Sequence, residues 1–551
     1  MSTPFEISDR LTEDFCDLAP ISATWYGVKG RDHLWDDTSP DGHAARAELY
    51  AAAIEELRPH LDHPERKQAV AARVLSAAME ERLRRFEHRE YLVDLNHIYS
   101  PVQIYRDVFD LMDPKEEETW RNIVTRLGSI EAPLAGYRLC LEAGILAGET
   151  VARRQVESAI QQCRSLASGE SRFLKYVAMA DELGRDREAI QDAVNNARKA
   201  YGEMADWLEQ VYLPEAAESD AVGRERYVRA ADYFLGIAID PEETYRWGWD
   251  EVHRLRAEMK ETAAEIDPDR SIEEVIELLD TDPDRAAPSH EEFAEFVETI
   301  QAEAVGQLAG EHFDVPEELR KVTVNIAPDD GALGAWYHGP SEDMSRPGSI
   351  WYAPGSRTAL PVWQEVSTAY HEGFPGHHLQ VGTATMLRDE VSRFHRLFLW
   401  KSGAGEGWAL YAERLMDELG FFTNPEYRLG LLASQLFRAT RIVVDIGTQL
   451  ELEIPADAPL HAGETWNYDI AVDYMDQIGL QERDVAESEV KRYLGWFGQA
   501  ISYKVGEREI LKMREERKEK EGADFDIRKF HKDLLEAGAI RLDQVRELVV
   551  H

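Results

Sequence analysis

Apolar residues recur every three or four positions over most of the 551-residue chain, and charged residues fill the positions between them. Such spacing puts the apolar side chains on one face of a helix, so it is typical of amphipathic helices packed around a core. Short stretches rich in proline and aspartate interrupt the pattern and are typical of loops. The pattern predicts helices at 44–58, 66–96, 116–146, 150–183, 185–213, 241–266, 290–309 and most of 426–452, with loops at 213–220, 266–270 and 280–289. We therefore expect a mainly α protein.

Residues 316–356 depart from this helical pattern. They contain VTVNIAP (322–328), GAWYHGP (334–340) and SIWYAPG (349–355), three short runs rich in β-branched and aromatic residues. Runs of this kind, bounded by glycine, proline and aspartate, predict strands. The sequence therefore predicts one small β-sheet, near 320–355, inside an otherwise helical chain.

The charge of the chain limits its partners. Its 105 acidic and 62 basic side chains give a net charge of −43 at pH 7. Nucleic acids and anionic membrane surfaces are polyanions, so neither is an expected partner of so acidic a protein. Apolar residues make up 44% of the chain, which is enough for a packed core and excludes an intrinsically disordered protein.

The cysteines and the N-terminal stretch indicate a compartment. Cys16, Cys140 and Cys163 are too few for a disulfide framework or a four-cysteine zinc site, so we expect three packed free thiols. The N-terminal stretch lacks the basic and apolar regions of a secretory signal, and no run of about 20 apolar residues could span a membrane. These features predict a soluble, cytoplasmic protein.

The segment EVSTAYHEGFPGHHLQ (365–380) concentrates residues that bind metals. His371, Glu372, His377 and His378 lie within eight positions of one another. A zinc hydrolase needs imidazole ligands, an open position for water and a carboxylate that accepts the proton of that water. In the H-E-x-x-H motif one helix supplies all of these, because residues four apart share a face.

The spacing here is two residues longer than in that motif. His371 and His377 would be about 240° and 9 Å apart on an unbroken helix, too far to chelate one ion. The intervening Gly-Phe-Pro-Gly can break the helix, because proline lacks an N–H and glycine allows unusual backbone angles. We favour His377 as the second ligand, with His378 supporting it or facing the substrate.

A third ligand is expected from GAGEGWALYAERLMDELG (403–420). Glu406 stands near the start of the helix predicted there, and the neighbouring glycines Gly405 and Gly407 would allow another backbone to approach closely. Glu413, seven residues later, lies on the same helix face and is the alternative ligand.

Residues 489–507, EVKRYLGWFGQAISYKVGE, contain candidates for binding a substrate. Tyr503 is the candidate donor to an oxyanion. Arg492 and Arg441, with Tyr493 beside them, are candidates for binding a substrate carboxylate.

The order and spacing of these blocks resemble a known family. LPVWQEVSTAYHEGFPGHHLQ, GEGWALYAERLMDELG, RATRIVVDIG (438–447) and GQAISYKVG (498–506) are similar to the bacterial domain of unknown function 885, which itself resembles the glutamate-type zinc metallopeptidases, the gluzincins. The matching blocks span about 357–506. Gln449 stands where that pattern leads us to expect a histidine, and Phe497 stands where we expect a proline.

The resemblance implies a fold and a set of roles. It implies a large zincin-like multi-helix fold with a central cleft, one side formed by a helical part at 1–315 and the catalytic side by 316–551. It implies one Zn²⁺ per chain, with the general base at Glu372 and metal ligands at His371, His377 and Glu406.

We therefore expect a zinc-dependent hydrolase, most simply a metallopeptidase of carboxypeptidase or oligopeptidase type that acts on short peptides. A hydrolase of another small amide or ester would use the same residues. The third alternative is a metal-free helical binding protein with a degenerate site, which the long histidine spacing and Gln449 would favour. A homodimer is left open.

Overall fold

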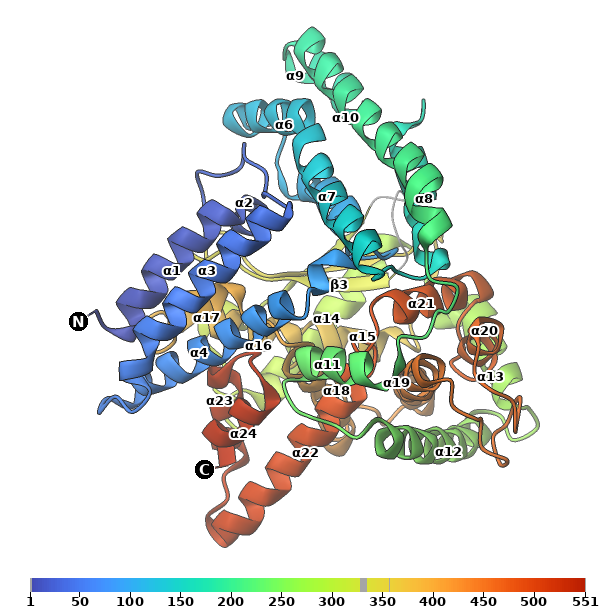
Figure 1. Cartoon of the computed structure of the whole chain (residues 1–551). Helices are drawn as coiled ribbons and strands as arrows, with labels where there is room; N and C mark the ends of the chain where they lie inside the picture. Colours follow the sequence, from blue (N-terminus) through green and yellow to red (C-terminus); the bar gives the residue numbers. More distant parts are fainter. Residues whose placement is uncertain (1, 328–333, 356, 551) are drawn as a thin grey trace. The chain divides into compact units, whose positions relative to one another are not determined.

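The computed structural model describes residues 2–327, 334–355 and 357–550 (Figure 1). The chain is mainly helical, as the sequence predicts, and its strands form two small sheets. Two compact units divide it: Met1–Asp220 with Ser392–Phe398 and Leu494–Trp496, and the remainder. The first unit therefore consists mainly of the residues up to Asp220. All residues of the predicted site lie in the second unit.

The first unit is built of helices. Pro133 explains why the predicted helix at 116–146 is two helices, because its ring clashes with the carbonyl of the residue four positions earlier, Ser129, where the first of them ends. The helices of this unit are α1 (Pro4–Leu18), α2 (Pro20–Trp25), α3 (Pro40–Leu57), α4 (Arg66–Glu87), α5 (Pro101–Asp107), α6 (Glu117–Ser129), α7 (Glu131–Ala147), α8 (Arg153–Ala167), α9 (Leu174–Leu183), α10 (Arg187–Trp207) and α17 (Arg393–Phe398).

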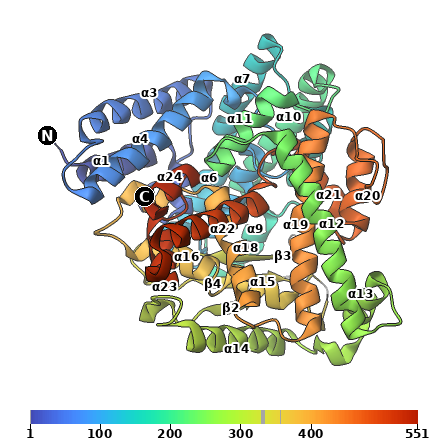
Figure 2. The same ribbon diagram turned by 90° about the horizontal axis from the view of Figure 1, so that it is seen from below.

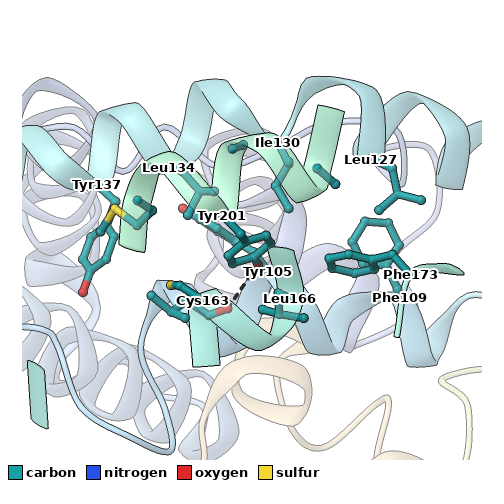
Figure 3. Close-up of a cluster of buried hydrophobic side chains, with 14 of the residues drawn as sticks. Tyr105, Phe109, Leu127, Ile130, Leu134, Tyr137, Cys163, Leu166, Phe173 and Tyr201 are labelled. Atoms are coloured by element: carbon teal, nitrogen blue, oxygen red, sulfur yellow. Dashed lines mark hydrogen bonds between the residues drawn. The ribbon is translucent and has the colours of Figure 1, made fainter. Parts of the chain in front are cut away.

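Aromatic side chains fill the core of the first unit (Figure 3). The ring of Phe173 packs edge-on against Phe109 at 5.7 Å between centroids and contacts Tyr201 at 5.9 Å. The buried hydroxyl of Tyr201 donates to the carbonyl of Val102 at 3.2 Å. Cys16, Cys140 and Cys163 are buried free thiols, as expected.

The second unit holds the long helices and both sheets. Its helices are α11 (Gly223–Leu235), α12 (Pro241–Ile266), α13 (Ile272–Thr281), α14 (His290–Leu308), α15 (Glu365–Glu372), α16 (His377–Met386), α18 (Ser402–Glu418), α19 (Pro425–Leu450), α20 (Tyr468–Gln477), α21 (Arg483–Gly495, whose last residues belong to the first unit), α22 (Ser502–Glu521), α23 (Ile527–Ala537) and α24 (Leu542–Val550). Capping residues determine where several of these helices begin. Asp240 accepts a hydrogen bond from Glu243 N at 2.8 Å before Pro241 at the first position of α12.

The predicted small sheet is present. Strands β2 (Thr323–Ile326), β3 (Gly334–His338) and β4 (Ser349–Ala353) are ordered β2-β4-β3, with β2 parallel and β3 antiparallel to β4. Residue 328, at the end of the first predicted strand, lies outside the described residues. A second sheet, which the sequence did not predict, pairs β1 (Ala286–Ala287) with β5 (Leu360–Pro361).

Two helix pairs position the site. The long helices α12 and α19 run side by side, and α22 packs along α18 (Figure 2). Glycines bring α18 and α22 into backbone contact, because a Cβ on Gly407 would lie 2.5 Å from the carbonyl carbon of Gly506. This contact sets Glu406 of α18 near the start of α22, where Tyr503 lies. None of the helices in the described part of the chain is apolar over the length that a bilayer requires.

Candidate metal centre

A break in the backbone lies between the first two histidines. Helix α15 ends at Glu372, α16 begins at His377, and the peptide bond between Phe374 and Pro375 is cis. Gly376 is required here, since a Cβ on it would lie 1.9 Å from the carbonyl oxygen of His371. The interruption therefore compensates for the long spacing of the two histidines, because it places His371 and His377 at the facing ends of two helices.

Two side chains from other helices hold this break. The amide of Gln301, from α14, donates to the carbonyl of Ala369 at 2.9 Å and accepts from Phe374 N at 2.5 Å. The indole N–H of Trp408, from α18, donates to the carbonyl of Pro375 at 3.0 Å. Because Gln301 and Trp408 are buried and satisfied, the turn has one defined geometry.

Three side chains meet at the break with the geometry of a metal site. Glu406 Oε2 lies 3.5 Å from His371 Nε2 and 3.4 Å from His377 Nε2. One ligand atom from each of the three residues lies within 4.8 Å of the others. Ligand atoms about 2.1 Å from a tetrahedral zinc are roughly 3.4 Å apart, so both carboxylate–imidazole spacings match those of ligands that share one ion.

A second carboxylate supports His371. Glu413 Oε1 lies 2.7 Å from His371 Nδ1, and Ser367 Oγ donates to the other Glu413 oxygen at 2.6 Å. Since the carboxylate accepts, Nδ1 carries a proton, and Nε2 is the nitrogen that faces Glu406. A carboxylate behind a histidine in this way orients it as a metal ligand. Glu413, the alternative ligand from the sequence, therefore lies behind the group and Glu406 lies in it.

The charges of the group favour a cation. Burial alone would lower the pKa of His371, but hydrogen bonds to Glu406 and Glu413 raise it to about 10. The carboxylates of Glu413, which is buried, and Glu406, which is partly buried, thus stabilise positive charge between them, and a divalent ion can supply that charge in place of a proton. The donor set, two imidazoles and a carboxylate, is one that zinc prefers.

Glu372 lies beside the group without joining it. It follows His371 directly and is 8% exposed. Burial raises the pKa of its carboxyl group, and the neighbouring His371 and His377 act in the opposite direction. A carboxylate whose pKa is raised is better matched to accepting a proton from water, so its chemistry suits a general base.

His378 lies with both ring nitrogens bonded to the protein. Its Nε2 lies 3.0 Å from the carbonyl oxygen of Leu319, and its Nδ1 lies 3.0 Å from the hydroxyl of Tyr337 on β3. The carbonyl only accepts, so Nε2 donates and Tyr337 donates to Nδ1. Burial lowers the pKa of His378 to about 4. With both nitrogens occupied, His378 anchors α16 to its neighbours, and this geometry leaves it no nitrogen for a metal or a substrate.

Tyr503 lies next to the metal group. Its ring stacks on that of His371, with 6.3 Å between centroids and 17° between planes. The guanidinium carbon of Arg441 lies 4.8 Å from the centre of the same tyrosine ring. The structure therefore brings Tyr503 and Arg441, from separate predicted blocks, to the side of the group that His371 occupies.

Tyr493 and Arg492 form a network behind Arg441. Arg441 Nε donates to the Tyr493 hydroxyl at 3.0 Å, and Arg441 Nη2 pairs with Glu489 at 2.8 Å. Arg492 pairs with the other oxygen of Glu489 at 3.2 Å and donates to Gln499. Tyr493 is fully buried, so it supports the arginines and does not itself face solvent.

Two residues beside the site were not predicted from the sequence. Arg438 lies one helical turn before Arg441 on α19, and its Cζ is 5.8 Å from the Tyr503 ring. Trp400 is 42% exposed and lies 5.7 Å from the His377 ring. Arginines three residues apart in an apolar helix were a signal for the first. Nothing near Trp400 in the sequence pointed to the second.

Gln449 stands where the family pattern suggested a histidine, and it links segments of the second unit by hydrogen bonds. Its side chain accepts from Val222 N at 3.0 Å and donates to the carbonyl of Tyr493 at 3.2 Å. It is fully buried. Its amide thus joins α19 to two other segments, and a glutamine can do so because it carries both a donor and an acceptor.

The fold and the site define a mainly helical protein with a buried group of two histidines and one glutamate that could hold a metal ion. Residues 20–549 match the family described as bacterial protein of unknown function, DUF885. The chain belongs to this family, and the match extends over the helical N-terminal part that the sequence blocks had not included.

Solved structures confirm the fold at low sequence identity. A candidate lipoprotein from Colwellia psychrerythraea is 23% identical, with a TM-score of 0.85 over 99% of this chain and 98% of that one. A candidate lipoprotein of unknown function from Shewanella oneidensis is 19% identical, with a TM-score of 0.75 over the full length of both chains. No protein with a curated description matches this chain.

Proposed function

We propose that this protein is a zinc-dependent hydrolase, most simply a metallopeptidase that cuts short peptides. The observation that carries this proposal is the placement of His371, His377 and Glu406 at ligand spacing, with Glu372 next to His371 in the chain and electrostatically coupled to all three. A zinc ion held there would polarise the scissile carbonyl and lower the pKa of a water molecule. The helix break brings His371 and His377 to Glu406 despite their long spacing, and this supports a metal site over a metal-free protein.

The residues of the chain supply the remaining steps. Glu372 accepts a proton from the attacking water, whose oxygen bonds to the carbonyl carbon. When the carbon–nitrogen bond breaks, the same proton passes from Glu372 to the leaving amine. Tyr503, stacked on His371, is the candidate donor to the carbonyl oxygen as negative charge develops there.

Metal content tests the proposal first. Elemental analysis of protein purified without chelator should find about one zinc per wild-type chain. The variants His371→Ala, His377→Ala and Glu406→Ala should lose it, while folded His378→Ala should keep it, because His378 bonds only to protein. A wild-type protein that takes up no metal when zinc is supplied contradicts the proposal.

Activity tests the second part. Zinc-loaded protein should hydrolyse short peptides, and Glu372→Gln should abolish turnover while keeping the metal. Because an ester or a non-peptide amide would use the same residues, a substrate panel must contain all three classes. If only the esters or only the non-peptide amides were hydrolysed, the protein would still be a hydrolase, but its substrate would not be a peptide.

The names of the two solved relatives bear on location. Both are described as candidate lipoproteins, and lipoproteins belong to the cell envelope. We therefore propose an envelope location over the cytoplasmic one expected from the sequence. Fractionation of cells with detection by antibody would find the protein with the envelope. Recovery in the cytosolic fraction would contradict this proposal and support the cytoplasmic location expected from the sequence.

A further inference from the structure

Three arginines gather next to the metal group. Arg438 and Arg441 lie one turn apart on α19, and Arg492 lies on α21. Within the described part of the chain, Glu489 is the carboxylate that pairs with Arg441 and Arg492, and no carboxylate lies within 4 Å of the Arg438 guanidinium. The cluster, defined here as Arg438, Arg441 and Arg492, thus has three guanidinium groups and one carboxylate in direct ion pairs with them. In a chain with a net charge of −43, such a cluster stands out.

Some N–H donors of this cluster have no hydrogen-bond acceptor among the described residues. Arg438 Nε, Arg441 Nη1 and Arg492 Nε are buried and have no acceptor among the described residues. A buried donor without an acceptor destabilises the folded protein, and more so when it is charged. An anionic ligand would supply the missing acceptors, and a planar carboxylate matches the fork of a guanidinium. The cluster therefore has the chemistry of a carboxylate-binding site.

The position of the cluster sets an upper limit on the distance between Arg438 and the candidate metal ligand His371. The centre of the Tyr503 ring is 5.8 Å from Arg438 Cζ and 6.3 Å from the centre of the His371 ring. Arg438 Cζ is therefore at most about 12 Å from the His371 ring, a distance spanned by three or four extended residues at about 3.3–3.6 Å each. Its charge also acts on the carboxyl groups of Glu372 and Glu413.

Arg438 differs from the other two arginines. Arg441 and Arg492 are held by Glu489, so their orientation is set before any ligand arrives. Arg438 is partly exposed, and its guanidinium lies over the rings of Phe437 and Tyr503. It is therefore the arginine whose charge is most available to a ligand.

We propose that the cluster binds the free terminal carboxylate of a peptide substrate, with Arg438 as the principal donor. The scissile bond then lies within about three residues of the C-terminus of the substrate. Beside the other histidine, the exposed indole of Trp400 offers an apolar surface to a substrate side chain. This inference rests on the proposed function and narrows it to peptides cut near their C-terminus.

The test compares free acids with amides. A random tetrapeptide library is supplied to the zinc-loaded wild type as free acids and, separately, as C-terminal amides, with products identified by mass spectrometry. The wild type should cleave the acids about 10- to 100-fold faster, the range that a charged hydrogen bond supports. Arg438→Gln should lower this ratio at least about tenfold, and Arg438→Lys should lower it less, because a lysine keeps the charge.

Arg508→Gln is the matched control. Arg508 is also a half-buried arginine of the second unit, on α22, but it lies over Trp247 and pairs with Glu509. Its loss should leave the acid-to-amide ratio unchanged. An equal rate on both libraries in the wild type overturns the inference, as does an unchanged ratio in Arg438→Gln. The hydrolase proposal would stand in either case.

A binding measurement separates the two proposals if no peptide is cleaved. Equilibrium dialysis of zinc-loaded Glu372→Gln protein against each library should retain acids over amides, and adding Arg438→Gln should remove that selectivity. Selective retention without turnover in the wild type would uphold the carboxylate site and overturn the hydrolase. No selective retention would overturn the carboxylate site.

Discussion

At the scale of single residues, the two ring nitrogens of each histidine decide its role. His371 has one nitrogen toward Glu413 and the other toward Glu406, whereas both nitrogens of His378 are bonded to the protein. His377 turns Nε2 toward Glu406, and its Nδ1 is buried without a partner among the described residues. Adjacent and chemically identical side chains thus differ because their helix faces differ.

Glu413 should control metal affinity without touching the metal. Replacing it by glutamine in Glu413→Gln removes the charge behind His371, so zinc affinity should fall about 10- to 100-fold. Competition with a zinc chelator measures this fall. Glu418→Gln is the control, since Glu418 lies on the same helix but is exposed and pairs with Arg514. Equal affinities in Glu413→Gln and wild type would show that the carboxylate does not orient the ligand.

At the scale of helices, close backbone contacts carry the site. Gly407 and Gly506 bring α18 against α22, and Gly376 brings the start of α16 against the end of α15. These contacts place residues from three distant segments within reach of one ion. A side chain at any of the three glycines would separate the helices that hold the ligands.

Gly407→Ala should therefore destabilise the protein and weaken metal binding. Its Cβ would lie 2.5 Å from the Gly506 backbone, which cannot yield as a flexible side chain would. Overpacking of this kind costs about 1–3 kcal/mol. Thermal unfolding and zinc content measure the two effects.

Gly306→Ala is the control for that prediction. Gly306 lies inside α14, and a Cβ added to it would have no neighbouring atom of the described residues within 4 Å. Alanine there should stabilise the helix by about 0.5–1 kcal/mol, because glycine loses more backbone freedom on folding. If both alanine variants shifted the melting temperature in the same direction, close packing would not be the function of Gly407.

Asp445 should make stability depend on pH. Burial raises the pKa of Asp445 to about 7, although Tyr227 and Gly498 both donate to it. The unfolded value is about 3.9, so the folded state holds this proton more tightly. Its contribution is full below about pH 4 and is lost as pH rises to about 7.

Asp445→Asn removes this dependence, because an amide oxygen can accept the same two hydrogen bonds without ionising. The melting temperature of the variant should exceed that of the wild type by an amount that grows between pH 5 and pH 7.5, corresponding to a few kcal/mol. A difference that stays constant over this range would mean that Asp445 does not change its protonation there.

At the scale of the whole molecule, the large negative net charge should affect stability. A charge of −43 makes the folded chain repel itself, and the many surface ion pairs recover little of this cost. Salt screens repulsion between exposed charges, with a Debye length of about 30 Å at 0.01 M and 8 Å at 0.15 M. The melting temperature should therefore rise when NaCl is raised from about 0.01 M to 0.15 M. A fall would mean that attractive pairs outweigh the repulsion.

The sequence predicted most helices, because a 3.6-residue apolar period is a local property. The helix predicted at 241–266 has these bounds in the structure, where Asp240 and Pro241 mark its start. The helices predicted at 116–146 and 150–183 are each divided in two, since proline and short polar turns act on the backbone more strongly than the apolar period. The two-residue strands of the second sheet are too short to leave a pattern.

The sequence by itself determined the mainly helical class, the acidic surface, the small sheet and the residue types of the candidate site. Those features depend on composition and on neighbours a few positions apart. Only the tertiary structure decided that Glu406 faces the two histidines while Glu413 stands behind one, and that Arg438 lies beside Tyr503. These relations join segments tens of residues apart, and helix packing sets them through contacts that no local spacing records.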